Sequence, residues 1–217
     1  MEIEAFLERL VNYGESKGLF LKIPIKDVKD SCCTKALTEV YDFDKCKELV
    51  SKAHNLNSPK SCDGLKIIPT KNMIDFIEFK GWKKFIEWQL KDGDEQEKIE
   101  QQINNFRLDE KITDSLLILE SLMSHIDFKL LKNEKRAYLD TPKRFIILTD
   151  IEELNQRPLE QLTVTLGNLA SMSSSIESLI AKKFGTEIKS ISGDTLKNLQ
   201  EPKTMTCSTI DKFYKDA

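Results

Sequence analysis

Two short apolar runs separated by a polar turn form the most informative stretch of the chain. The runs Gly64–Ile68 and Met73–Lys80 are rich in Ile and Phe, and Pro69–Asn72 lies between them. Such runs, bounded by Pro and Asn, are typical of a β-hairpin. Because side chains alternate between the faces of a strand, we predict that Glu78 and Lys80 point the same way, roughly 6–7 Å apart. Their face also carries Ile74 and Phe76, and the other face carries Asp75, Ile77, Phe79 and Gly81.

The register of this hairpin follows if its turn closes symmetrically. Ile68 then pairs with Met73. In the same register Asp63 lies directly across from Glu78, with the two Cβ atoms about 5 Å apart. Like charges in this position destabilise a hairpin, so a cation should offset them, and a slip of one residue would separate them. Lys80 is one candidate, and a divalent metal ion with oxygen ligands is the better one.

Hydrophobic periodicity predicts helices before and after the hairpin. Met1–Gly18 has the spacing of an amphipathic helix, and Lys45–His54 is a shorter helix with Asp44 as its N-cap. Ile103–Ile126 is the strongest helix of the chain because its apolar residues recur every three or four positions. Its predicted core-facing residues are Ile112, Leu116, Leu119, Met123 and Ile126, widened by Leu117, Ile118 and Leu122.

Further strands complete a predicted α/β fold. Phe20–Ile25 contains Pro24 and indicates an edge strand, whereas Phe145–Leu148 is an uninterrupted apolar run typical of a strand buried on both faces. Lys35–Phe43 fits either a helix or a strand. The order of helix, hairpin, long helix and buried strand predicts a mixed β-sheet flanked by helices.

We expect one domain over residues 1–184, with its core at about 44–150 and an additional C-terminal helix at about 158–184. That helix either covers the sheet or forms a dimer contact. Polar composition predicts an exposed excursion at Lys91–Glu100, a basic loop at Lys129–Lys143 and a loosely packed tail over residues 185–217.

The amino-acid composition narrows the cellular location that we expect for the protein. The five cysteines, an odd number, form no CxxC pair, which predicts reduced thiols and neither a disulfide framework nor a zinc site. The adjacent Cys32 and Cys33 should point in different directions and act as small core residues. No apolar run approaches the ~20 residues that span a bilayer, and the acidic opening MEIEAFLERL does not resemble a signal peptide. We therefore expect a cytoplasmic protein without a membrane partner.

The hairpin acids resemble the motif of the PD-(D/E)xK nuclease superfamily, which has a restriction-endonuclease-like fold. The motif is carried by Cys62-Asp63 and by Glu78-Phe79-Lys80, with Cys62 where proline is common. The resemblance extends over about residues 44–150. It implies that Asp63 and Glu78 hold Mg²⁺ or Mn²⁺ and that Lys80 acts with them in catalysis. It also implies a further acid from an early helix, for which Glu8 and Glu48 both remain open.

The resemblance implies a metal-dependent phosphodiesterase that cleaves nucleic acid by attack of a metal-activated water. We favour DNA over RNA as the substrate, and both remain open. The net charge of −3 supplies no basic footprint for nucleic acid, so a homodimer or a protein partner would have to add one. Local basic clusters are the alternative source: Lys80, Lys83 and Lys84, and then Lys129, Lys132, Lys135, Arg136, Lys143 and Arg144. Aromatic residues around Trp82 either stack on bases or cap the sheet.

Two other functions stay open at this point. A catalytically inactive nuclease-like fold would serve as a binding subunit, and an unrelated α/β protein would serve as an interaction module. Neither requires metal at Asp63 and Glu78, because an acid and a lysine on one strand face are also common as surface charges. His54 is expected to be a helix cap or a surface group.

Overall fold

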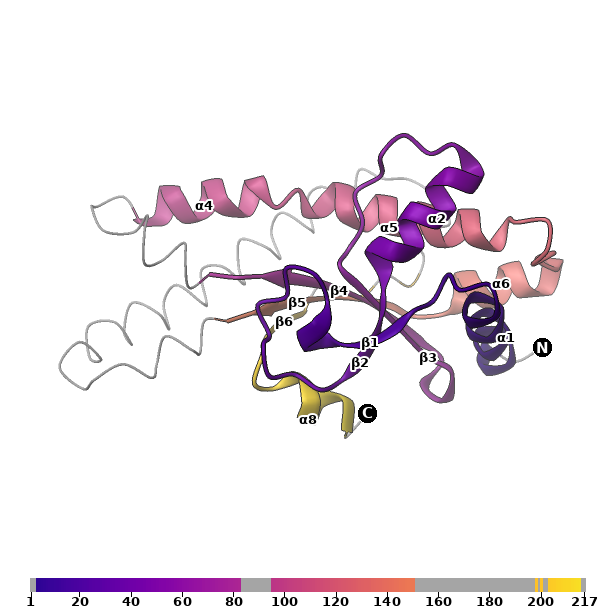
Figure 1. Cartoon of the computed structure of the whole chain (residues 1–217), viewed down its shortest axis with the longest axis horizontal. Coiled ribbons are helices and arrows are strands. Elements are labelled where there is room, and N and C mark those ends of the chain that lie inside the picture. The colour runs from indigo at the N-terminus through magenta and orange to yellow at the C-terminus, as the bar shows by residue number, and fades with distance from the viewer. Residues whose placement is uncertain (1–2, 83–94, 151–197, 199, 201–202, 216–217) are drawn as a thin grey trace.

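A computed structural model describes residues 3–82, 95–150, 198, 200 and 203–215 (Figure 1). Within these residues a mixed six-stranded sheet has the order β1-β2-β3-β4-β5-β6. The strands are β1 (Lys22–Pro24), β2 (Glu39–Asp42), β3 (Gly64–Ile68), β4 (Met73–Lys80), β5 (Lys143–Thr149) and β6 (Lys203–Thr206). The pairs β1–β2, β2–β3 and β3–β4 are antiparallel, whereas the pairs β4–β5 and β5–β6 are parallel. The prediction of an α/β fold with a mixed sheet is confirmed.

The predicted hairpin and its register are also confirmed. Ile68 pairs with Met73, and the ladder continues in that register to Gly64 opposite Ile77. The turn is a short 3-10 helix, η2 (Pro69–Lys71), and it ends at Asn72 in the left-handed conformation with φ of 52°. Asparagine tolerates this conformation better than most residues because its short polar side chain bonds locally.

Helices and a loop segment cover the two faces of the sheet (Figure 1). The helices are α1 (Ile3–Ser16), α2 (Phe43–His54), α4 (Glu95–Asn105), α5 (Leu108–Met123), α6 (Lys132–Asp140) and α8 (Ile210–Lys215), and the loop after β1 contains η1 (Ile25–Asp27). α1, α2, α5 and α6 contribute to one core with Ile74 and Phe76. α8 and the loop after β1 contribute to the other core with Ile77 and Phe79. The predicted alternation along β4 therefore holds.

Strand β5 lies between β4 and β6 and is buried on both faces, as its apolar run predicts. Phe145 and Ile147 join the first core, and Ile146 and Leu148 join the second. β1 lies at the edge of the sheet, where a proline can be tolerated because one side of the strand has no ladder partner. The segment that fits either a helix or a strand contributes β2.

Several predicted helix boundaries and loops are wrong. The N-cap of α2 is Asp42, whose carboxylate accepts from the Lys45 N–H at 3.0 Å, and not Asp44. The long helix is interrupted before α5 at Arg107, which has φ of 49°. Ile126 lies beyond α5 and is 78% exposed.

Two predicted polar segments are partly helical. The predicted excursion at Lys91–Glu100 contains the start of α4 in its described part, and the predicted basic loop Lys129–Lys143 contains α6. α6 is held in place by its buried Glu134, which forms an ion pair with Arg9 of α1. A helix whose buried side includes a carboxylate does not stand out by hydrophobicity.

The C-terminal segment joins the sheet, so the prediction of a loosely packed tail is wrong for its described part. β6 pairs with β5 over four residues, from Ile146–Lys203 to Thr149–Thr206. Ile210 of α8 is fully buried, and a disulfide joins Cys207 to Cys33. The prediction that all cysteines are reduced is therefore also wrong. The predicted helix at about 158–184 lies outside the described residues.

Candidate active site

Asp63 lies immediately before β3 and is fixed by backbone contacts on both of its sides. Its N–H donates to the carbonyl of Ile77 at 3.0 Å, and its Oδ2 accepts from the N–H of Phe79 at 2.7 Å. Its carbonyl accepts from the N–H of Phe43, the first residue of α2, at 3.2 Å. These contacts place Asp63 beside Glu78, which is the position that the hairpin register predicts.

Glu78 and Lys80 lie on the same face of β4. The Glu78 side chain is fully buried, and the Lys80 side chain is 17% exposed. The Lys80 Nζ lies 2.5 Å from the Glu78 Oε1 and also lies over the ring of Phe106, 4.8 Å from its centroid. Lys80 therefore reaches from a buried carboxylate toward the surface.

A second lysine, Lys111 of α5, completes the cluster. Its Nζ forms an ion pair with the Glu78 Oε1 and lies 3.7 Å from the Asp63 Oδ1. One ammonium group thus faces both predicted carboxylates. Lys111 is not among the residues predicted from the sequence, although it lies on the buried stripe of its helix, three positions after Leu108 and four before Ser115. A lysine on such a stripe is a signal that periodicity could have detected.

Helix α5 also holds the loop that carries Asp63. The carboxylate of Asp114 accepts from the Lys60 N–H at 2.7 Å, and the hydroxyl of Ser115 accepts from the Cys62 N–H at 2.9 Å. Because Asp114 and Ser115 lie one turn after Lys111 on the same helix, a single rigid element fixes both the loop and the second lysine.

The environment raises the pKa of both carboxyl groups. Burial, reinforced by the charge of Asp63, raises the pKa of Glu78 to about 7, against the opposing effects of Lys80 and Lys111. Burial also raises the pKa of Asp63, and the charge of Lys111 opposes this shift. Burial by itself would lower the pKa of Lys111, but the charges of Glu78 and Asp63 raise it overall. Two acids in one buried site therefore resist full ionisation unless more positive charge is present.

The donor set fits a divalent cation of the Mg²⁺ class. Glu78 Oε1 faces two ammonium groups, whereas the buried Glu78 Oε2 has no hydrogen-bond partner among the described residues. A buried carboxylate oxygen without a partner is costly and rare. Mg²⁺ takes oxygen ligands, commonly one or two carboxylates with water in the remaining positions. Asp63 and Glu78 can provide such a pair.

Neither early-helix candidate for a third acid reaches this pair within the described part of the chain. Glu8 is exposed on α1, and Glu48 is exposed on α2, where it pairs with Lys45 at 3.4 Å. Asp44 at the start of α2 is the early-helix acid whose charge acts on Asp63 and raises its pKa. The Asp44 Oδ1 accepts from the hydroxyl of Ser61 at 2.9 Å, two residues before Asp63.

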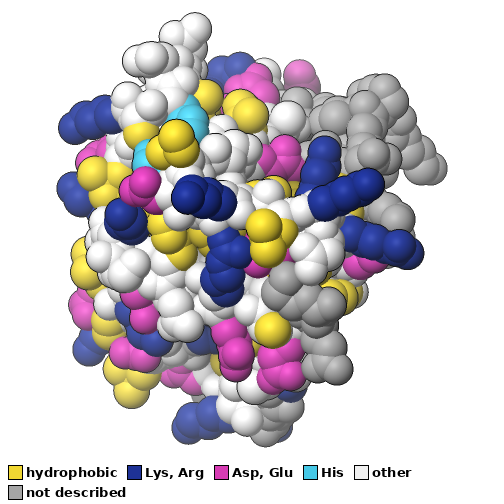
Figure 2. All heavy atoms as spheres, turned by 90° about the vertical axis from the view of Figure 1, so that its right-hand side faces the viewer, with side chains coloured by type: hydrophobic (Ala, Val, Ile, Leu, Met, Phe, Trp, Pro, Cys, Tyr) yellow, Lys and Arg dark blue, Asp and Glu magenta, His cyan; other side chains and the backbone are white. Residues whose placement is uncertain are grey.

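Lys143 and Arg144 of the second predicted basic cluster make contacts within the protein, whereas Lys129, Lys132, Lys135 and Arg136 are exposed. Lys143 is fully buried and donates to the carbonyls of Tyr138 and Thr141, at 2.7 and 3.0 Å. Arg144 forms two hydrogen bonds with the buried Asp75. Figure 2 shows Lys and Arg side chains interspersed with Asp and Glu over the face it presents. Lys83 and Lys84 lie outside the described residues.

The structure also shows the surroundings of Trp82 and His54. Trp82 is 1% exposed and packs edge-on against Phe106, with ring centroids 5.4 Å apart, so it covers the sheet and is not open to a base. His54 lies at the end of α2 beside His125, with ring centroids 5.8 Å apart, in a pocket of about 170 Å³.

Comparison with known proteins adds no further assignment. No family model, curated protein or solved structure matches this chain. Among the helices that the structure describes, none has the length and apolar character needed to cross a membrane.

Proposed function

We propose that this chain is a metal-dependent phosphodiesterase that cleaves nucleic acid, with DNA as the first substrate to test, and that its core is restriction-endonuclease-like. One observation carries the proposal: Asp63 and Glu78 face the same lysine, and Glu78 also keeps a buried oxygen without a partner. The antiparallel strands β2, β3 and β4, followed by α5 and the parallel strand β5, support it. The resemblance implies a hairpin that is followed by a helix and a further strand.

In this proposal Asp63 and Glu78 hold Mg²⁺ or Mn²⁺ through their carboxylate oxygens. A divalent cation bound there lowers the pKa of a bound water and neutralises charge on the phosphate. The contacts of Asp63 with Ile77 and Phe79 keep its carboxylate directed along β4 toward Glu78. A site built on rigid backbone in this way needs little reorganisation when it binds.

Lys80 and Lys111 have different roles. Lys80, which occupies the lysine position of the motif and forms its ion pair with Glu78, donates to the attacking water or to a phosphate oxygen and stabilises the negative charge that develops there. Lys111 approaches from α5, contacts both acids and offsets their charge before a cation binds. Lys111 is therefore a positioning residue.

The same lysine favours a second candidate function. With Lys80 and Lys111 opposite Asp63 and Glu78, two ammonium groups already balance two carboxylates. A domain in which this cluster is only an ion-pair network would be a catalytically inactive binding subunit. Metal binding and cleavage separate the two functions.

The test is a cleavage assay on double-stranded DNA, single-stranded DNA and RNA with Mg²⁺, Mn²⁺ or EDTA. The wild-type chain is compared with Lys80→Ala and with Lys212→Ala, which removes an exposed lysine of α8 near the other face of the sheet. We expect metal-dependent cleavage that EDTA abolishes and that Lys80→Ala slows by about 100–1,000-fold. Lys212→Ala should cleave like the wild type.

Two results would overturn the proposal. Cleavage that is equal in the wild type and Lys80→Ala would assign the activity to another site or to a contaminant. If none of the three substrates is cleaved with either metal, the proposal that this chain is by itself a nuclease is overturned.

A further inference from the structure

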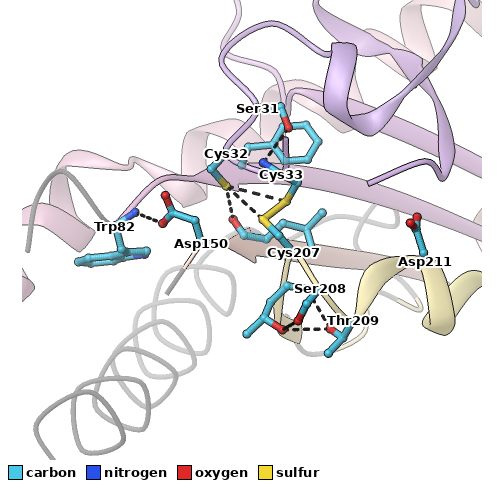
Figure 3. Close-up of a disulfide and its surroundings, with 12 residues drawn as sticks. Ser31, Cys32, Cys33, Trp82, Asp150, Cys207, Ser208, Thr209 and Asp211 are labelled. Carbon is cyan, nitrogen blue, oxygen red and sulfur yellow. Dashed lines mark hydrogen bonds between the residues drawn. A yellow bond between two sulfur atoms is a disulfide. The ribbon is translucent and has the colours of Figure 1, made fainter. Parts of the chain in front are cut away.

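Three cysteine sulfurs gather on the sheet face opposite Glu78 and Lys80. Figure 3 shows Cys32, Cys33 and Cys207 with their sulfurs directed toward one another. The three sulfur atoms all lie within 4.8 Å of one another. Among the described residues, this is the group of three or more His, Cys, Asp or Glu side chains that lie close enough together to hold one metal ion. The cluster corrects two expectations: the adjacent Cys32 and Cys33 do not point apart, and a distant cysteine joins them.

Two separate segments supply these sulfurs. Cys32 and Cys33 lie in the loop between β1 and β2, and Cys207 directly follows β6. The parallel pairing of β6 with β5 brings the segments together, because the Cys207 N–H donates to the carbonyl of Thr149, the last residue of β5, at 2.9 Å. The Cys32 thiol in turn donates to the carbonyl of Leu148 at 3.5 Å. Backbone carbonyls of β5 thus hold both segments of the cluster in place.

The spacing of the sulfurs matches that of thiolates around a tetrahedral metal ion. A Zn–S bond of about 2.3 Å places two tetrahedral sulfur ligands about 3.8 Å apart. The Cys32 sulfur lies 3.7 Å from that of Cys207 and 4.0 Å from that of Cys33. The third pair, Cys33 and Cys207, forms a disulfide, so these two sulfurs can bind one metal ion only after that bond is reduced.

We propose that, when the disulfide is reduced, Cys32, Cys33 and Cys207 form a binding site for Zn²⁺ or a similar thiolate-binding metal ion. Three thiolates leave the fourth position of the tetrahedron to water. Cys33 is fully buried, whereas Cys32 and Cys207 are partly exposed and give the ion a way in. Such an ion would tie the loop after β1 to the end of β6, as the disulfide does in the oxidised chain.

The oxidised and metal-bound forms exclude each other. A dithiol reductant supplies two electrons and two protons to the Cys33–Cys207 bond, yields two thiols and becomes a disulfide itself. Binding of Zn²⁺ then releases one proton from each thiol that becomes a thiolate ligand. In the oxidised chain Cys32 is the one member of the cluster that remains a free thiol, and a single cysteine does not provide the three protein ligands of the proposed site.

Co²⁺ is the probe, because thiolate ligands give it sulfur-to-metal charge-transfer bands and a tetrahedral site gives it strong visible bands. The full chain is reduced with a dithiol, freed of reductant without air and titrated with Co²⁺ and then with Zn²⁺. We expect one Co²⁺ per chain with both sets of bands, displacement by Zn²⁺, and no such bands from the oxidised chain.

Variants separate this site from the carboxylate pair. Cys32→Ser keeps both disulfide cysteines, so its folding can be checked in the oxidised form, and it should bind more weakly by at least the ~10–100-fold that loss of an outer-shell partner costs. Cys46→Ser, a buried cysteine of α2, and Asp63→Asn should leave the bands unchanged.

The proposal is overturned if the reduced wild type gives no charge-transfer band, or if Cys32→Ser gives the same band with the same affinity. Because Asp63→Asn is included, loss of the carboxylate site would not be mistaken for loss of this one.

Discussion

The raised pKa of Glu78 predicts that the protein loses stability as the pH rises toward neutrality in the absence of metal. Its folded-state pKa is about 7, compared with 4.5 in the unfolded chain, so the folded state holds the proton more tightly. A carboxyl group of this kind favours folding at low pH, and the advantage is lost as the pH rises from about 4.5 to about 7. The raised pKa of Asp63 acts in the same direction.

The size of the effect follows from the shift. A shift of roughly 2.5 units at about 1.4 kcal/mol each gives about 3 kcal/mol in total, of which about 2–3 kcal/mol falls between pH 5 and pH 7.5. Lys111 contributes little in this window, because its raised pKa lies above 10.5. Lys143 sets the upper limit of the window: burial lowers its pKa to about 8, and its contribution changes only above that value.

The assay is urea unfolding of the wild type and of Glu78→Gln at several pH values from 5 to 7.5, with EDTA present. With an m-value of about 2 kcal/mol/M, the wild-type midpoint should fall by about 1 M over this range relative to that of Glu78→Gln. The variant cancels the contributions of the other titrating groups that both proteins share. Parallel midpoint profiles for the two proteins would refute the reasoning, because Glu78 would then not be destabilised by its surroundings.

Three further substitutions test other parts of the structure by the same unfolding assay. Lys111→Gln removes a charge that lowers the pKa of Glu78, so the pH at which the stability falls should move above about 7; an unchanged profile would contradict the contact. Asp75→Ala removes the buried carboxylate that pairs with the partly exposed Arg144 of β5 and should cost about 1–3 kcal/mol, whereas a loss below about 0.5 kcal/mol would refute the pairing. Gly14→Ala places a Cβ against the ring of Phe20 and should cost about 1–3 kcal/mol; a neutral result would show that the ring moves freely.

The hairpin could be predicted because its information is local. Alternation along Met73–Lys80, the turn residues before it and the symmetric closure together fix both the faces and the register. The position of Asp63 beside Glu78 follows from that register. The stripe of α5 and the buried strand β5 were predicted for similar reasons, since each carries its periodicity within a few turns or residues.

The other parts of the site and fold depend on contacts between residues far apart in the chain, which the pattern of residues along the sequence does not reveal. Lys111 meets Glu78 only after α5 packs on the sheet, and the disulfide partners are separated by 174 residues. Cysteine pairing cannot be deduced from spacing alone. β6 has the polar sequence KTMT, and it is a strand because the exposed edge of β5 pairs with it.

The early-helix acid near Asp63 could not be predicted either, because its position also depends on how the elements pack. Periodicity assigns Asp44 to the start of a helix but cannot say that this end of α2 lies against the residue before β3. The Asp44 carboxylate accepts from the hydroxyl of Ser61, two residues before Asp63, and also pairs with Lys47. Glu8 and Glu48, which lie on the predicted helices, are directed elsewhere.

The most direct test of the carboxylate site is calorimetric titration of the wild type and Asp63→Asn with Mn²⁺ at pH 7.5, with Glu48→Gln as the control on an exposed acid of α2. We predict that the wild type and Glu48→Gln bind one or two ions per chain and that Asp63→Asn loses this binding while remaining folded. If Asp63→Asn binds Mn²⁺ like the wild type, or if the wild type binds none, Asp63 and Glu78 do not form a metal site.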